Sequence, residues 1–110
     1  MNSMVEFTSS PTELEAVINL RYRVLRAPWN QSLETARDEL EHLSFNAFIR
    51  SAGGQVIACG RLQLNSPDTG QIRYMAVENQ EQGKGYGAAI LRALELKAQS
   101  LGLRKIELQA

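Results

Sequence analysis

Three glycines, Gly83, Gly85 and Gly87, occupy alternate positions directly in front of a strongly helical run. Glycine is unfavourable in regular structure, so this placement favours a close approach of the backbone to a ligand. The N-terminus of a helix offers unpaired N–H groups and a partial positive charge, which attract anions and phosphates above all. The sequence therefore predicts a phosphate-binding turn in which the backbone of residues 83–88 surrounds its ligand.

Two common phosphate-binding patterns fit this segment poorly. A P-loop requires a serine or threonine after its lysine, but Lys84 is followed by Gly85. A dinucleotide fingerprint does match Gly83, Gly85 and Ala88. Such fingerprints follow a strand of a parallel sheet almost immediately, whereas here the polar stretch "ENQEQ" intervenes and antiparallel strands come first. Dinucleotide binding is therefore the least favoured of the three functions considered for this segment.

The elements that must position this turn follow from hydrophobic periodicity and turn residues. The stretch "SSPTELEAVINLRYRVLRAPW" predicts a helix over residues 11–26, with Ser10 as its N-cap, Glu13 completing a capping box and Pro28 ending it. A weaker pattern predicts a second helix over residues 33–42. The stretches "FNAFIR", "QVIACGRLQLN" and "QIRYMAV" predict an antiparallel meander.

The second of these strands should place its apolar side chains on one face, namely Val56, Ala58, Leu62 and Leu64. After the glycines, a core-facing helical stripe is predicted at Ile90, Leu94, Ala98 and Leu101, with Gly102 past the helix end. The final stretch "LRKIELQA" is then a strand parallel to "QIRYMAV". The whole pattern predicts an α/β fold with a mixed sheet, organised as one domain over residues 1–110.

Composition narrows the class of protein. The chain has 110 residues, 44% of them hydrophobic, with 12 basic and 12 acidic side chains, which is typical of a globular domain. No run is long enough for a membrane helix and the start lacks a secretory signal, so we expect a cytoplasmic protein without a membrane partner. Balanced charge argues against nucleic acid. The lone Cys59 and His42 indicate no disulfide and no metal site, and Cys59 should be a buried thiol.

A third pattern, Q/R-x-x-G-x-G/A, is met by Gln82, Gly85 and Gly87 after a strand that ends in "MAV". The segment "IRYMAVENQEQGKGYGAAILRALE" resembles the acetyl-CoA-binding motif of the GNAT superfamily of N-acetyltransferases. The stretches "LRYRVLRAPWNQ" and "ACGRLQLN" are similar to a bacterial branch of unassigned acetyltransferases. This resemblance implies a GNAT-like acyl-CoA N-acyltransferase fold, with acetyl-CoA as co-substrate.

The resemblance also implies roles for particular residues. The pyrophosphate should lie on backbone N–H groups from Gln82 to Gly87, and the pantetheine arm should pair with the strand at Met75 and Val77. The N–H of Val77 is the candidate catalytic group, because a fixed donor at a developing oxyanion lowers the barrier, and a bulge in the strand would aim it. The implied cofactor-binding set is Met75, Ala76, Val77, Gln82, Gly83, Lys84, Gly85, Tyr86, Gly87 and Ala88.

This chain departs from the family pattern at its end. Family members normally continue after the last strand with a helix, which often carries a tyrosine that protonates the leaving thiolate, and then two strands, whereas the sequence ends at Ala110. An exposed last strand would favour pairing with another chain, so we expect a homodimer. No general base is evident, and Glu78 and Glu81 are the acidic candidates near the motif. Arg26, Trp29 and Arg73 are expected to line an acceptor site that favours a carboxylate.

The function implied is transfer of acetyl from acetyl-CoA to a primary amine of a small molecule or peptide, by direct attack in a ternary complex. Because the segment expected to supply the general acid is missing, one alternative is a non-catalytic acyl-CoA-binding or interaction module. Catalytic turnover distinguishes the two functions.

Overall fold

The computed structural model describes residues 4–108, except for the side chain of His42, and is built on one mixed sheet. Its strands are β1 (Val5–Phe7), β2 (Phe45–Arg50), β3 (Val56–Ser66), β4 (Thr69–Val77) and β5 (Lys105–Leu108), which lie in that spatial order. The first four pair antiparallel, and β5 pairs parallel to β4. The predicted meander and the predicted parallel final strand are both confirmed.

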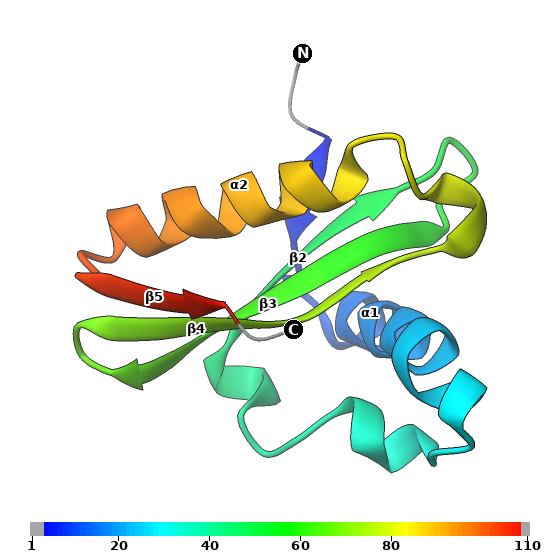
Figure 1. Cartoon of the computed structure of the whole chain (residues 1–110), viewed down its shortest axis with the longest axis horizontal. Helices are drawn as coiled ribbons and strands as arrows, with labels where there is room; N and C mark the ends of the chain where they lie inside the picture. Colours follow the sequence, from blue (N-terminus) through cyan, green and yellow to red (C-terminus); the bar gives the residue numbers. More distant parts are fainter. Residues whose placement is uncertain (1–3, 109–110) are drawn as a thin grey trace.

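One helix covers each face of the sheet (Figure 1). Helix α2 (Tyr86–Ser100) buries Ile90, Leu94 and Ala98 on one face. Helix α1 (Pro11–Arg21) buries Val17 and Leu20 on the other. The core therefore consists of two apolar layers separated by the sheet.

The first helix begins as predicted but widens before it ends. Ser10 Oγ accepts from the N–H of Glu13 at 3.1 Å, while the Glu13 carboxylate accepts from the N–H of Ser9 at 2.7 Å, one residue earlier than in a standard capping box. Residues Tyr22–Arg26 form a π-helical turn, and Ala27–Trp29 a 3₁₀ turn. The prediction of a helix over residues 11–26 that ends before Pro28 is confirmed, since the α-helical and π-helical residues together span 11–26 and this proline lies in the separate 3₁₀ turn, near the helix-start position that proline tolerates.

The helix predicted over residues 33–42 is wrong. This segment forms only two short 3₁₀ turns, Leu33–Ala36 and Glu41–Leu43. The carboxylate of Asp38 accepts from the N–H of Leu40 at 2.9 Å, a local bond that competes with helix formation. Asp38 and Glu41 are also ion-paired with arginines from β3 and α1. Tertiary ion pairs therefore override a weak helical pattern.

Two strand details also differ from expectation. Strand β1 was not predicted, because its three residues are too few for a visible alternation. Val56 packs on the α1 side with Cys59, opposite to Ala58 and Leu62. The reason is that the pairing of β2 with β3 shifts by one residue between the pair Arg50–Val56 and the pair Ile49–Ala58. The hairpin itself, with Gly54 at φ +91°, lies where it was predicted.

The end of α2 directs the chain back to the sheet. Gly102 has φ +76°, and its N–H and that of Leu103 bond to the carbonyls of Gln99 and Ala98, which is a Schellman motif. Leu101, predicted to face the core, is instead partly exposed at this turn. Strand β5 then pairs with the first part of β4. Across the part of the chain that is described, no helix is both long and apolar enough to cross a membrane.

Gly60 allows α2 to lie close to the sheet, which gives a prediction for stability. A Cβ at this position would lie 2.6 Å from Met75 Sδ and 2.7 Å from Ile90 Cγ2. We expect Gly60→Ala to lower the free energy of unfolding by about 1–3 kcal/mol, the usual effect of overpacking a core. Urea denaturation measures this. Gly53→Ala is the control, because the nearest atom to its Cβ is Ser51 Oγ at 3.9 Å; equal losses in both variants would contradict the packing argument.

Candidate functional site

The glycine turn joins the end of β4 to the start of α2. A 3₁₀ turn spans Asn79–Glu81, and Gly83 and Gly85 follow with φ values of +83° and +87°, which residues with a side chain rarely adopt. Cβ atoms at these two positions would meet nothing within 4 Å. Both glycines are thus required by backbone conformation, and the space beside them is open.

Gly87 is a different case, because neither its backbone nor its packing requires a glycine. Its φ is not positive, and a Cβ there would make only an ordinary contact of 3.8 Å with Val77 Cγ2. The position lies in the first turn of α2, which has no side-chain cap among the described residues. The first backbone bond from this turn to the N-cap is donated by Ala89 to the Gly85 carbonyl at 3.0 Å. The N–H groups of residues 86–88 are therefore directed at a position where a ligand, rather than the protein, can accept them.

Strand β4 contains a bulge in front of this turn. Ala58 and Cys59 pair with Val77 and Ala76, but Arg61 pairs with Arg73, so that Tyr74 and Met75 together oppose the single residue Gly60. Tyr74 has φ +58°, unusual for a residue with a large side chain. A bulge that the family resemblance implied for this strand is therefore present. A bulge bends the strand and redirects the side chains beside it.

The backbone of Val77 faces away from β3. The N–H of Glu78 donates to the carbonyl of Ile57 at 2.9 Å, and backbone groups of consecutive residues in an antiparallel strand point to opposite edges. The N–H of Val77 therefore faces the β5 side, whereas Ala76 faces β3. The carbonyl of Val77 accepts from Gln82 Nε2 at 3.3 Å, which ties the end of β4 to the glycine turn.

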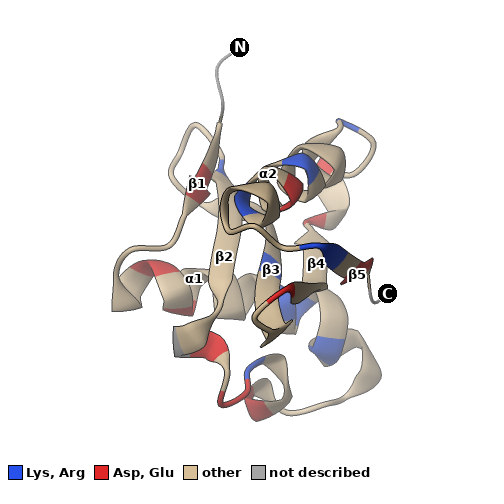
Figure 2. Cartoon of the chain, turned by 90° about the vertical axis from the view of Figure 1, so that its left-hand side faces the viewer, with Lys and Arg blue, Asp and Glu red and all other residues tan. Residues whose placement is uncertain are grey.

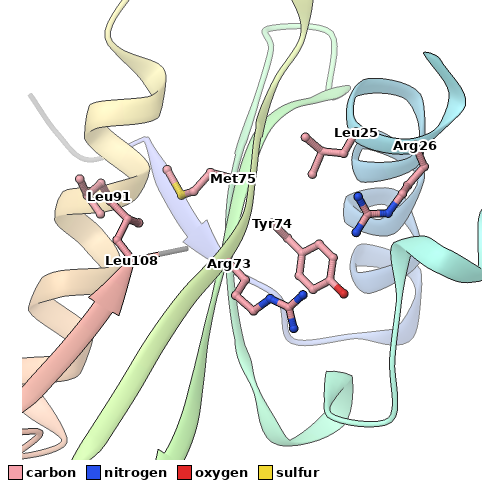
Figure 3. A pocket seen from close by; sticks show the side chains of 7 residues that line it. All are labelled: Leu25, Arg26, Arg73, Tyr74, Met75, Leu91 and Leu108. Atoms are coloured by element: carbon pink, nitrogen blue, oxygen red, sulfur yellow. The ribbon is translucent and has the colours of Figure 1, made fainter. Parts of the chain in front are cut away.

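The pairing of β4 with β5 covers only Thr69–Ile72, so the following residues border an opening at the sheet edge. A cavity of about 470 Å³ lies there. Figure 3 shows Met75, Leu91 and Leu108 on one side of β4 and Leu25, Arg26, Arg73 and Tyr74 on the other. The sequence predicted Arg26 and Arg73 in such a site. Trp29, predicted with them, is 75% exposed and does not line this cavity.

Buried ion pairs support the wall of the cavity on the α1 side. The side chains of Arg21 and Arg61 are both fully buried, and each donates to Glu41 Oε2 at 2.7 Å. Arg61 also makes two bonds to Asp38, at 2.8 and 3.0 Å, and these lower the pKa of the Asp38 carboxyl. Arg21 further donates to Asn46. Burial disfavours the charge of Arg61, but its carboxylate partners raise its pKa on balance.

The ring of Tyr74 lies at the centre of this wall. Four guanidinium groups lie over it, with distances to the ring centroid of 4.5 Å for Arg21, 4.7 Å for Arg61, 4.9 Å for Arg73 and 5.7 Å for Arg26. A tyrosine face attracts such cations. Sequence reasoning missed Tyr74, because neither the bulge that turns it nor the two buried arginines has a local signal.

The remaining predicted residues are placed as follows. Lys84 is exposed and pairs with Glu81 at 2.9 Å, and this hydrogen bond raises the pKa of Lys84. Glu78 pairs with Arg23 at 2.6 Å, so both acidic candidates for a general base are ion-paired. Tyr86 is partly buried against the α2 side of the core. Ala88 is exposed in the first turn of α2.

Cys59 is buried, as predicted from its apolar context. Its thiol lies 3.7 Å from the carbonyl of Tyr74, and burial raises the pKa of the thiol to about 11. Because the thiolate is the nucleophilic form, this group is unsuited to covalent catalysis at neutral pH.

The comparison with protein families assigns the chain to a class. The model of the Acetyltransferase (GNAT) family matches residues 14–110, so the chain belongs to the GNAT acetyltransferase family. Membership supports acyl transfer from acyl-CoA, as the motif in residues 82–87 implied. The predicted mixed α/β fold of this family is likewise confirmed.

Solved structures with a similar fold include three useful examples. A Trypanosoma brucei acetyltransferase has a TM-score of 0.72 at 19% identity, covering 96% of this chain and 82% of its own. The Acinetobacter haemolyticus aminoglycoside antibiotic 6'-N-acetyltransferase has a TM-score of 0.74 at 18% identity, and the match covers 100% of this chain and 79% of that enzyme's chain. Rv2747 from Mycobacterium tuberculosis, in complex with CoA and NLQ, has a TM-score of 0.69 at 25% identity, and the match covers 94% of this chain and 62% of the Rv2747 chain.

Proposed function

We propose that this chain is an acetyl-CoA-dependent N-acetyltransferase that acts on a primary amine of a small molecule or peptide. The observation that carries the proposal is the arrangement of β4. Its unpaired edge after Ile72 borders the cavity, its bulge directs Val77 toward that edge, and its end leads into the glycine turn. The extended pantetheine arm of acetyl-CoA would need the unpaired edge of β4, and its diphosphate would need the glycine turn that follows this edge.

The residues fit acetyl-CoA. Beside Gly83 and Gly85 the space is open, and the N–H groups of residues 86–88 supply donors for a pyrophosphate. The backbone groups of Met75 and Val77 are available for pairing with the pantetheine arm, as the unpaired edge of a sheet pairs with an added strand. Lys84, already paired with Glu81, adds positive charge at the turn.

The chemistry assigned to the chain itself is positioning and charge stabilisation. Bound acetyl-CoA would supply the thioester: in a ternary complex the nitrogen of a neutral amine would form a bond to the acetyl carbon as the C–S bond breaks, and CoA would leave as the thiol with the proton that the amine loses. The N–H of Val77 donates to the carbonyl oxygen as negative charge develops on it. The cavity holds the amine close to that carbonyl, and such placement contributes much of the rate without a strong base.

We further propose that residues 1–110 act as one domain and that the protein works as a cytoplasmic homodimer. Strand β5 is exposed along its whole described length, and Leu108 retains 64% of its accessible surface. An apolar edge strand of this kind is a surface for pairing with another chain. Analytical ultracentrifugation tests this assembly, and a monomer at micromolar concentration with full turnover would contradict it.

The proposed activity is tested by measuring acetyl transfer from acetyl-CoA to a panel of primary amines, following both CoA release and the acetylated product. We expect product that depends on the amine, with one CoA released per acetyl group. Tight acetyl-CoA binding without turnover over the panel would contradict the enzyme and support a non-catalytic acyl-CoA-binding module.

A further inference from the structure

The α1 side of the cavity carries more positive charge than the protein neutralises. The four arginines around Tyr74 face two carboxylates, Asp38 and Glu41. Both carboxylates bond directly to the buried arginines, Arg21 and Arg61. Figure 2 shows acidic residues on the segment between α1 and β2, below the sheet. Among the described residues, Arg26 has no carboxylate partner at the cavity wall, and Arg73 has only the more distant Asp38.

Each of these two arginines keeps free donors. Arg26 donates through Nε to the carbonyl of Thr35 at 3.0 Å, and the described residues show no carboxylate paired with it. Arg73 approaches Asp38 only to 3.9 Å, too far for a hydrogen bond, and its side chain is 30% exposed. The Nη groups of Arg26, and all the guanidinium nitrogens of Arg73, are therefore available to a ligand in the cavity.

The fold also holds both groups in place. The π-helical turn over Tyr22–Arg26 carries Leu25 and Arg26 at the cavity, and the Thr35 bond together with the Tyr74 ring restricts the guanidinium of Arg26. Arg73 precedes the bulge in β4 and lies over the same ring. Insertions of the π-helical kind are frequent at functional sites. Figure 3 shows both side chains converging beside Tyr74.

These positions do not suit the phosphates of CoA. Arg73 precedes Val77 by four residues, about 13 Å along an extended strand, and the glycine turn lies beyond Val77. The anion near Arg26 and Arg73 would thus belong to the other substrate. Because a guanidinium fork binds oxyanions such as carboxylate and phosphate with two parallel bonds, the shared chemistry is an oxyanion on the acceptor.

We propose that Arg26 and Arg73 bind an oxyanion, a carboxylate or a phosphate, carried by the amine that accepts the acyl group. This inference rests on the proposed acetyl transfer and specifies its substrate class. The two arginines set specificity and orient the acceptor, and they make no contact with the reacting atoms. Arg21 and Arg61 are fully buried and lie over the same Tyr74 ring, so they help to hold the ring on which Arg26 and Arg73 lie.

The test compares matched pairs of acceptors that differ only in the anion: glycine with glycinamide, and O-phosphoethanolamine with ethanolamine. At the same concentration of the free amine form, we expect the chain to prefer the anionic member of at least one pair. In Arg73→Gln and in Arg26→Gln, kcat/KM for that member should fall by about 10- to 100-fold, the range typical of a hydrogen bond to a charged group. The value for the neutral member and the KM for acetyl-CoA should change by less than about threefold.

Arg92→Gln, on the exposed face of α2, is the matched loss of one positive charge and should leave all four rates unchanged. A binding measurement independent of turnover is NMR titration of the CoA-bound chain with N-acetylglycine and with N-acetylglycinamide, and with O-phosphoethanolamine and ethanolamine. Preference for the carboxylate pair or the phosphate pair identifies the source of the oxyanion.

The inference is overturned if the anionic members show no advantage in either assay, or if the arginine substitutions raise the KM for acetyl-CoA and affect both members equally. Turnover of neutral amines with no anion preference would leave the acetyltransferase proposal intact and remove only this inference. Arginine-dependent anion binding without acetyl transfer would remove the acetyltransferase proposal and leave only an oxyanion site at the two arginines.

Discussion

Replacing the backbone N–H of Val77 with an ester oxygen is expected to lower kcat by about 10²- to 10³-fold, the effect of losing one oxyanion donor. This N–H faces the open edge of β4, so the ladder with β3 does not depend on it. The substitution is made by incorporating the α-hydroxy analogue of valine, and single-turnover kinetics measure the chemical step. The loss should appear in kcat because the donor acts on charge that develops only in the transition state.

The same ester at Met75 is the matched control. The proposal assigns the N–H of Met75 to the pantetheine arm, so we expect a higher KM for acetyl-CoA with a kcat changed by less than about threefold. An unaltered kcat in the Val77 ester, in a protein that still unfolds at the wild-type urea concentration, would show that this donor does not act on the reacting carbonyl.

The largest expected loss of stability is for Glu41→Ala, about 3–5 kcal/mol in the free energy of unfolding. Glu41 is the shared partner of Arg21 and Arg61, whose side chains are both 0% exposed. Its removal leaves two buried cations with one carboxylate, Asp38, which lies on the Arg61 side. Urea denaturation at neutral pH measures the change.

Glu15→Ala removes an exposed ion pair of similar length, because Glu15 and Arg37 lie 2.9 Å apart with side chains 53% and 42% exposed. We expect a change below about 1 kcal/mol, since solvent already screens both charges. Comparable losses in the Glu41 and Glu15 variants would mean that the buried network contributes little beyond a surface pair.

Local patterns in the sequence were sufficient for the parts of the fold that local physics determines. Serine and glycine at the helix ends, the turn residues between the strands of the meander, and the stripe along α2 each specify their own element. The glycine turn was likewise visible, because Gly83 and Gly85 are needed for positive φ values. The family resemblance then placed Val77 and Met75 at the edge of a strand.

The α1 side of the cavity could not be predicted in the same way. A bulge directs Tyr74 to this side, and a π-helical turn places Arg26 there. Glu41 is held by two partners, Arg21 and Arg61, each about twenty residues away in the sequence. None of these has a sequence signature, because each depends on packing between distant segments. The failed helix over residues 33–42 has the same cause: two of its residues, Asp38 and Glu41, are held by Arg61.

The most direct test of the account is a thermal shift with acetyl-CoA, CoA and NAD on the wild-type chain and on Gly87→Glu. Gly87 is preferable to Gly85, whose φ of +87° would strain any replacement. Gln99→Glu places the same charge at the far end of α2 as a control. At one hundred times its dissociation constant, acetyl-CoA should stabilise the fold by about 2.7 kcal/mol, a shift of several degrees.

We expect this shift for acetyl-CoA and CoA but not for NAD, its loss in Gly87→Glu, and its retention in Gln99→Glu. Folded protein that shows no shift with acetyl-CoA, or a Gly87→Glu chain that keeps the full shift, would contradict the assignment of the glycine turn to the pyrophosphate. Stabilisation by NAD alone would instead indicate a dinucleotide site.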